Sequence, residues 1–129
     1  MQFAMNEPVQ PNAGYEGMSA AKLLRALGGD RDLLLEIIEL FQRDAPAMLA
    51  GVRKYADFSD RDALAKAAHM LKGSTANFGK SPLYEVTRDI EICAYDGDAA
   101  RLPELLERFE AAAEGFLQAL VQLKREVNT

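Results

Sequence analysis

Apolar residues recur every three or four positions along most of this 129-residue chain, the spacing that places them on one face of an α-helix. The pattern predicts a short helix followed by four long amphipathic helices. The expected spans are 19–27 for the short helix and 30–58, 61–78, 82–96 and 98–127 for the long ones. Each long helix then carries one apolar stripe, which a neighbouring element must cover.

The four stripes make up the predicted core, and the chain has far more alanine and leucine than valine and isoleucine. The stripes are Leu34, Ile37, Phe41, Ala45, Met48, Val52 and Tyr55; Leu64, Ala67 or Ala68, Leu71, Thr75 and Phe78; Leu83, Val86, Ile90 and Cys93; and Leu102, Leu105, Phe109, Ala112, Phe116, Leu120, Leu123 and Val127. Alanine and leucine account for 38 residues of the chain and valine and isoleucine for 9. This balance favours helix over sheet.

Capping residues, glycines and prolines define the expected helix ends. Ser and Asp side chains accept from the first free N–H groups of a helix, and a glycine can end one in a left-handed conformation. The predicted N-caps are Ser19, Asp30, either Ser59 or Asp60, Ser81 and Asp98, and the predicted stops are Gly28, Gly29, Gly79 and Gly97. Pro82 and Pro103 fit the first turns of their helices. Pro46 lies inside the first long helix and should kink it or loosen one turn.

Short links between the long helices favour antiparallel neighbours. The predicted fold is therefore all-α, an antiparallel up-down four-helix bundle with a short additional N-terminal helix, in one domain over residues 19–129. Residues 1–18 show little periodicity, and we interpret them as a flexible leader or the remnant of a tag.

Composition excludes several classes of function. The chain has one histidine, His69, and one cysteine, Cys93, too few for the usual zinc, copper or haem site. A lone cysteine is typical of a reducing compartment, so we expect a cytoplasmic protein. No apolar run is long enough to span a membrane, and the N-terminus does not resemble a signal peptide. The net charge of −5 argues against a general binder of nucleic acid or anionic membranes.

His69 is the candidate for chemistry because a helical wheel places it away from the core. With Leu71 set at 0° and about 100° added per residue, Leu64 and Phe78 fall within about 40° of it. His69 falls at about 160°, on the predicted solvent face. A buried histidine that satisfies a core hydrogen bond therefore fits poorly, and an exposed histidine without a task is the main alternative.

Small residues surround His69 on this face. Ala65 and Gly73 lie one turn to either side, and Ala76 is nearby. Glycine in a helix interior costs roughly 1 kcal/mol relative to alanine, so Gly73 calls for a reason. The wheel places it at about 200°, away from the core, which favours close approach of another molecule over close packing of two helices.

Two lysines flank the histidine. Lys66 and Lys72 lie three residues before and after His69, within side-chain reach of any group attached to its ring. A neutral imidazole has a ring-nitrogen lone pair that can act as a nucleophile, and a nearby ammonium can stabilise a phosphoryl group. A solvated charged face would also contain lysines, so the lysines gain meaning only together with His69 and Gly73.

The run from Ala68 to Gly79, AHMLKGSTANFG, resembles the signature of the histidine-containing phosphotransfer (HPt) domain, in which His-x-Leu-Lys-Gly is followed by small residues and a closing glycine. The likeness extends over residues 19–127, which resemble that family's short leading helix and four-helix bundle. Phe78 and Gly79 are also similar to the phosphoacceptor domain of chemotaxis kinases, whereas Ala76 and Asn77 are closer to the stand-alone relay type.

The resemblance implies that His69 is phosphorylated, at Nε2, that Lys72 stabilises the phosphoryl charge and that Gly73 leaves room for the partner. The remaining residues expected to contact the partner are Lys66, Ala65 and Ala76. The implied partners are response-regulator receiver domains, with a hybrid sensor histidine kinase upstream. Because phosphoryl transfer needs Mg²⁺ and no phosphate loop or acidic cluster is evident here, we expect Mg²⁺ on the receiver and no cofactor on this chain. The protein would be a monomeric phosphoryl carrier without turnover of its own.

Two other functions compete with this interpretation. An acyl-transfer enzyme could use Ser74 with His69, but the chain has no Gly-x-Ser-x-Gly elbow and Ser74 points to another side of the helix. A helical module that docks a response regulator without accepting phosphate is the second alternative. The presence of His69, Lys72 and Gly73 together favours phosphotransfer over both.

Overall fold

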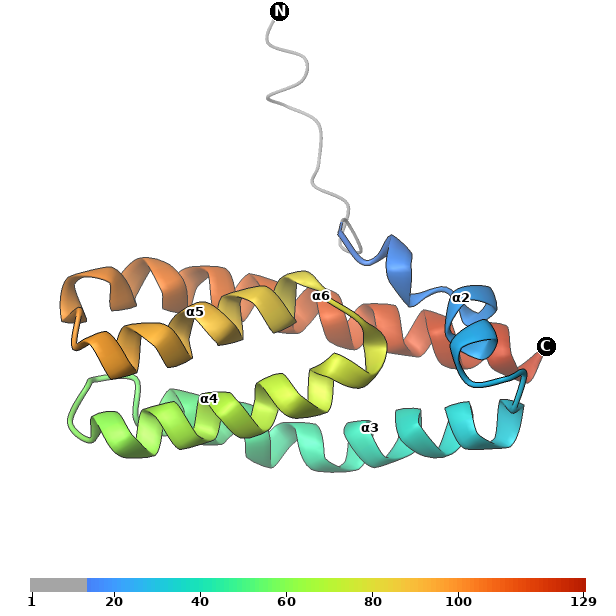
Figure 1. Cartoon of the computed structure of the whole chain (residues 1–129), viewed down its shortest axis with the longest axis horizontal. Coiled ribbons are helices and arrows are strands. Elements are labelled where there is room, and N and C mark those ends of the chain that lie inside the picture. Colours follow the sequence, from blue (N-terminus) through green and yellow to red (C-terminus); the bar gives the residue numbers. More distant parts are fainter. Residues whose placement is uncertain (1–13) are drawn as a thin grey trace, which may run out of the picture.

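The computed structural model describes residues 14–129, and this part of the chain is helical without a strand (Figure 1). A 3₁₀ turn (Glu16–Met18) leads into the short helix α2 (Ala20–Ala26). The long helices are α3 (Arg31–Lys54), α4 (Arg61–Thr75), α5 (Pro82–Asp96) and α6 (Leu102–Asn128), with 3₁₀ turns at Ala76–Phe78 and Ala99–Arg101. The all-α prediction is confirmed for these residues.

The four long helices pack side by side. α4 lies against α3 and α5, α6 lies against α5 and α3, and α2 contacts α3 and α6. In Figure 1 each long helix runs back along the one before it, and α2 lies beside the C-terminal end of α6. Phe41, Phe78 and Phe116 meet in the core, with ring centroids 5.0–5.7 Å apart. These aromatic contacts join α3, the turn after α4, and α6.

The packed domain extends to the N-terminal side of the boundary predicted at Ser19. Tyr15 and Met18 are buried in the core, and the Tyr15 hydroxyl donates to the carbonyl of Ala112. Burial raises the pKa of Tyr15 to about 12, although a hydrogen bond with the Leu83 backbone acts in the opposite direction. Residues 14–18 are therefore part of the packed domain and not of a leader. The rest of the predicted leader, residues 1–13, lies outside the described residues.

The first long helix is shorter than its apolar pattern predicts. α3 ends at Lys54 and not at residue 58, and Phe58 adopts a positive φ of 65° in the corner that follows. Tyr55 and Phe58 are half-buried and pack against the core from this corner, so their apolar character reflects a packed turn and not another helical turn. α3 continues through Pro46 without interruption.

The buried face of α3 also differs from the predicted stripe. Ile38 and Leu49 are buried, whereas Ile37 and Met48 are only partly covered. α3 packs between α4 and α6, and the direction of greatest burial is set by these two neighbours together. A similar shift of one residue occurs in α6, where Ala113 is buried and Ala112 is half-buried.

Most of the predicted caps are confirmed. The N-caps Ser19, Asp30 and Ser81 accept from backbone N–H groups three residues ahead, and Asp60 rather than Ser59 caps α4. Gly79 and Gly97 have positive φ angles of 91° and 73°. Asp98 does not cap α6 with its side chain, because a 3₁₀ turn separates it from the helix. Pro103 lies in the first turn of α6 as predicted.

Candidate functional site

His69 lies on the outer side of α4, and 68% of its side-chain surface is exposed. The side of α4 that faces the core carries Leu64, Ala68, Leu71 and Thr75, all of them buried. This burial pattern fixes the rotation of the helix and holds His69 outward, as the helical wheel predicts. The imidazole is thus available to another molecule while its helix is anchored in the core.

One edge of the imidazole is held by a carboxylate from the neighbouring helix. His69 Nδ1 lies 2.9 Å from Glu91 Oε2 on α5. Because an ionised carboxylate can only accept hydrogen bonds, this contact requires a hydrogen on Nδ1. The lone pair of the neutral ring then belongs to Nε2, on the opposite edge. Glu91 is 7% exposed, so the contact fixes the ring against a side chain that has little freedom to move.

Glu91 also binds the lysine that the sequence singles out. Lys72 Nζ lies 2.7 Å from Glu91 Oε1, so one carboxylate joins His69 and Lys72. Burial by itself raises the pKa of the Glu91 carboxyl, but the hydrogen bonds from Lys72 and His69 outweigh burial and hold the pKa below its ordinary value of 4.5. Glu91 is therefore ionised at neutral pH, and this is the condition under which its contact with His69 requires a hydrogen on Nδ1.

The surface beside His69 is open at Gly73. A Cβ atom built on Gly73 would have no heavy atom within 4 Å outside its own helix turn. Close packing of two helices therefore does not account for this glycine. Lys66 on α4 and Ala76 in the 3₁₀ turn that follows this helix are also exposed. Because Gly73 has no side chain, the backbone of α4 next to the imidazole is accessible.

Ala65 does not belong to this open surface. It is only 3% exposed, although it lies one turn from His69 and was expected to contact a partner. α4 packs along α5 on this side. A wider part of the surface of α4 is therefore buried than the predicted apolar stripe indicates. Ala65 is a core residue.

The residues of the alternative acyl-transfer site do not come together. Ser74 Oγ lies 3.4 Å from the sulfur of Met48 on α3, whereas His69 is tied to α5 on the other side of α4. Ser74 instead lines a small recess between α3 and the end of α4, together with Asn77 and Asp44. The geometry gives no support to a serine nucleophile activated by His69.

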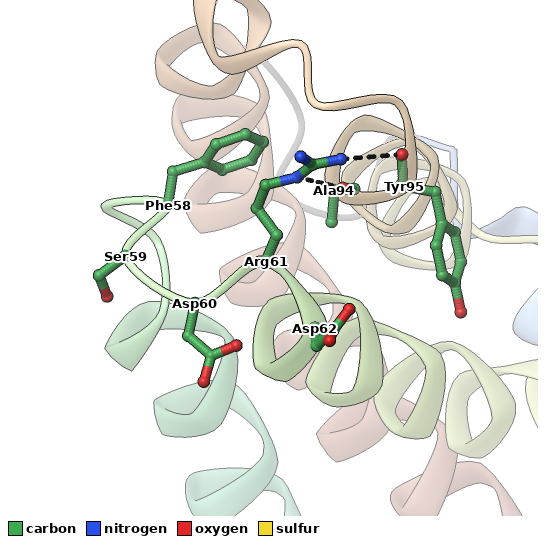
Figure 2. A pocket seen from close by; sticks show the side chains of 7 residues that line it. All are labelled: Phe58, Ser59, Asp60, Arg61, Asp62, Ala94 and Tyr95. Atoms are coloured by element: carbon green, nitrogen blue, oxygen red, sulfur yellow. Dashed lines mark hydrogen bonds between the residues drawn. The ribbon is translucent and has the colours of Figure 1, made fainter.

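A second recess lies at the corner between α3 and α4, and none of the predicted site residues lines it (Figure 2). At its centre Arg61 donates to the carbonyls of Ala94 and Tyr95 at 2.9 and 3.0 Å, which satisfies the C-terminal end of α5. The guanidinium also lies over the Phe58 ring. Arg61 therefore links the corner between α3 and α4 to the C-terminal end of α5.

Glu91 is the site residue that the sequence interpretation missed. It lies next to Ile90 and four residues after Thr87, both buried positions of α5. A carboxylate on the buried side of an amphipathic helix rarely occurs without a partner, and this was the available signal. What the sequence did not indicate is that the partners would be His69 and Lys72, because they lie on another helix.

No group of three or more His, Cys, Asp and Glu side chains in residues 14–129 is arranged to hold a metal ion. Cys93 is buried, and its Sγ lies 3.0 Å from the carbonyl of Asp98. Within the same residues no helix is long and apolar enough to cross a membrane.

The fold and the site together define a small helical protein with one exposed imidazole, which α4 and Glu91 hold in place. Residues 36–126, most of the chain, match the family model of the Hpt domain, and the chain belongs to this family. Hpt domains act in phosphorelay signalling as carriers of phosphoryl groups rather than as catalysts. Neither the curated proteins nor the solved structures gave a match to the chain.

Proposed function

We propose that this protein is a stand-alone histidine phosphotransfer protein whose long helices form the family's antiparallel four-helix bundle. His69 accepts a phosphoryl group from the aspartyl phosphate of a receiver domain and passes it to another receiver. The supporting observation is the hydrogen bond between His69 Nδ1 and Glu91, which places the nucleophilic lone pair on Nε2 of an exposed ring.

The transfer step needs little from this chain. The Nε2 lone pair attacks phosphorus, the N–P bond forms, and the bond between phosphorus and the aspartyl oxygen breaks to release a carboxylate. The Nδ1 hydrogen stays in place, and the positive charge that develops on the ring is stabilised by the Glu91 carboxylate. Transfer to a second receiver reverses these events with a different aspartate.

The neighbours of His69 support this chemistry. The Lys72 ammonium can neutralise the phosphoryl group, which carries about −1.5 to −2 charges. The open surface at Gly73 lets a receiver bring its aspartate within reach, and the exposed Lys66 and Ala76 border the same approach. The Mg²⁺ that phosphoryl transfer requires is supplied by the receiver.

The proposed setting is a cytoplasmic phosphorelay. The phosphoryl group comes from a hybrid sensor histidine kinase through its receiver domain and continues to a response regulator. The protein acts as a monomer and needs no cofactor of its own.

The test is to mix the protein with a receiver domain labelled on its aspartate with radioactive phosphate. Transfer should give a label that is stable to alkali and labile to acid, as a phosphohistidine is. Phospholysine behaves in the same way, so the site is assigned with the His69→Gln variant, which removes the single histidine of the chain and should take up no label. A wild-type protein that binds the receiver but takes up no label would support the alternative, a docking module without phosphotransfer. Label on the His69→Gln variant would refute the site.

A further inference from the structure

Thr87, on α5, is fully buried, and its hydroxyl lacks a hydrogen-bond partner. Among the buried side chains of residues 14–129 it is the one polar atom in this situation. Thr75 on α4 is equally buried, but its hydroxyl donates to the carbonyl of Lys72 at 2.9 Å. A buried hydroxyl without a partner is unfavourable and calls for an explanation.

The position of Thr87 relates it to Glu91. The two residues lie four apart on α5, so their side chains are neighbours on one face of the helix. Helical side chains lean toward the N-terminus of their helix, and Glu91 therefore extends over the turn that holds Thr87. Glu91 binds His69 and Lys72 of α4, so this face of α5 is the one next to the phosphoacceptor helix.

Phosphorylation creates a conflict for Lys72. In the present structure its ammonium is bound to Glu91 Oε1 at 2.7 Å. Nδ1 and Nε2 lie on opposite edges of the imidazole, so a lysine that approaches a phosphoryl group on Nε2 is drawn away from the carboxylate at Nδ1. Glu91 Oε1 would then lose its donor while it remains largely buried, which is costly for a charged oxygen.

We propose that Thr87 is the reserve donor for Glu91: when Lys72 turns toward the phosphoryl group on His69, the Thr87 hydroxyl donates to the carboxylate oxygen that Lys72 leaves. The inference rests on the proposed function. It accounts for the missing partner of Thr87, because the hydroxyl is satisfied in the phosphorylated state. Thr87 is thus a positioning residue that keeps Glu91 in place and, through Glu91, the His69 ring.

The test compares Thr87→Val, Thr87→Ser and the control Thr75→Val, with and without phosphate on His69. Unphosphorylated Thr87→Val should melt no lower than the wild type, because its hydroxyl has no hydrogen bond to lose. Its equilibrium constant for taking phosphate from a receiver should fall about five- to tenfold, the factor for one hydrogen bond. Thr87→Ser keeps the hydroxyl and should restore the wild-type equilibrium.

The control reverses this pattern. Thr75→Val removes an existing hydrogen bond, so we expect a lower melting temperature with an unchanged transfer equilibrium. A Thr87→Val variant that shows the wild-type equilibrium would overturn the proposal, as would a serine variant that fails to restore it. A loss of stability already present without phosphate would assign Thr87 a purely structural role.

Chemical phosphorylation separates this proposal from the function on which it rests. Phosphoramidate, a small donor, can load His69 without a receiver, and the rate of phosphohistidine hydrolysis then reports on the same contacts. We expect Thr87→Val to change this rate and Thr75→Val to leave it unchanged. If wild-type His69 accepts phosphate and Thr87→Val hydrolyses like the wild type, the role of Thr87 alone is refuted. If neither phosphoramidate nor a receiver loads the wild type, the proposed function fails and the role of Thr87 fails with it.

Discussion

Replacement of Glu91 by glutamine should destabilise the protein at neutral pH but not at low pH. The glutamine amide oxygen can still accept from His69 Nδ1, but it carries no charge to hold the Lys72 ammonium. The two contacts, at 2.9 and 2.7 Å, are charge-assisted, and such hydrogen bonds contribute about 1.5–3 kcal/mol when buried.

The expected loss is smaller than the sum of two such bonds. Lys72 and His69 have side chains that are 24% and 68% exposed, so water can replace part of what they lose. We therefore expect Glu91→Gln to lower the free energy of unfolding at pH 7 by about 1–2 kcal/mol. Urea denaturation followed by circular dichroism measures this difference.

The pH dependence follows from the lowered pKa of Glu91 in the folded state. A group of this kind stabilises the protein above its unfolded pKa of 4.5, and the contribution is lost as the pH falls through the lower folded pKa. The difference in the free energy of unfolding between wild type and Glu91→Gln should thus be largest at pH 7, decrease below pH 4.5 and vanish at still lower pH.

The matched control is Glu114→Gln, the same change at an exposed position in the middle of α6. Its effect should stay within about 0.5 kcal/mol at both pH values. The reasoning is refuted if Glu91→Gln and Glu114→Gln have equal effects at pH 7, or if the effect of Glu91→Gln is the same on both sides of pH 4.5.

Three further substitutions test the site and its scaffold. Gly73→Leu should slow phosphotransfer from a receiver without lowering the melting temperature, because the space beside Gly73 is open and leucine is the better helix former; an equal loss of stability would indicate packing instead. Lys72→Ala should slow transfer or shorten the lifetime of the phosphohistidine while binding of the receiver persists, and unchanged kinetics would remove its role. Gly97→Ala should cost about 1–2 kcal/mol of stability, because φ is 73° and the new Cβ would lie 2.9–3.1 Å from the Arg61 guanidinium; chemical denaturation that matches the wild type would contradict this.

Local sequence signals predicted much of the scaffold correctly. Three N-caps, the glycines with positive φ and the position of Pro82 depend on contacts within a few residues, so the sequence carries them directly. The predicted end of α3 was wrong, because the apolar residues Tyr55 and Phe58 continue the helical spacing although they pack against the core from a turn. An apolar pattern records burial and does not distinguish a helix from a packed corner.

The residues of the site also fall into those that local sequence signals predicted and those that depend on tertiary packing. By itself the sequence determined that His69 faces away from the core and that Gly73 lies beside it, because both facts depend on the rotation of a single helix about its axis. Only the tertiary structure decided that Ala65 is covered and that Glu91 binds both His69 and Lys72. These contacts join residues of two helices, and their distance depends on how α4 and α5 pack, which no spacing within one helix can specify.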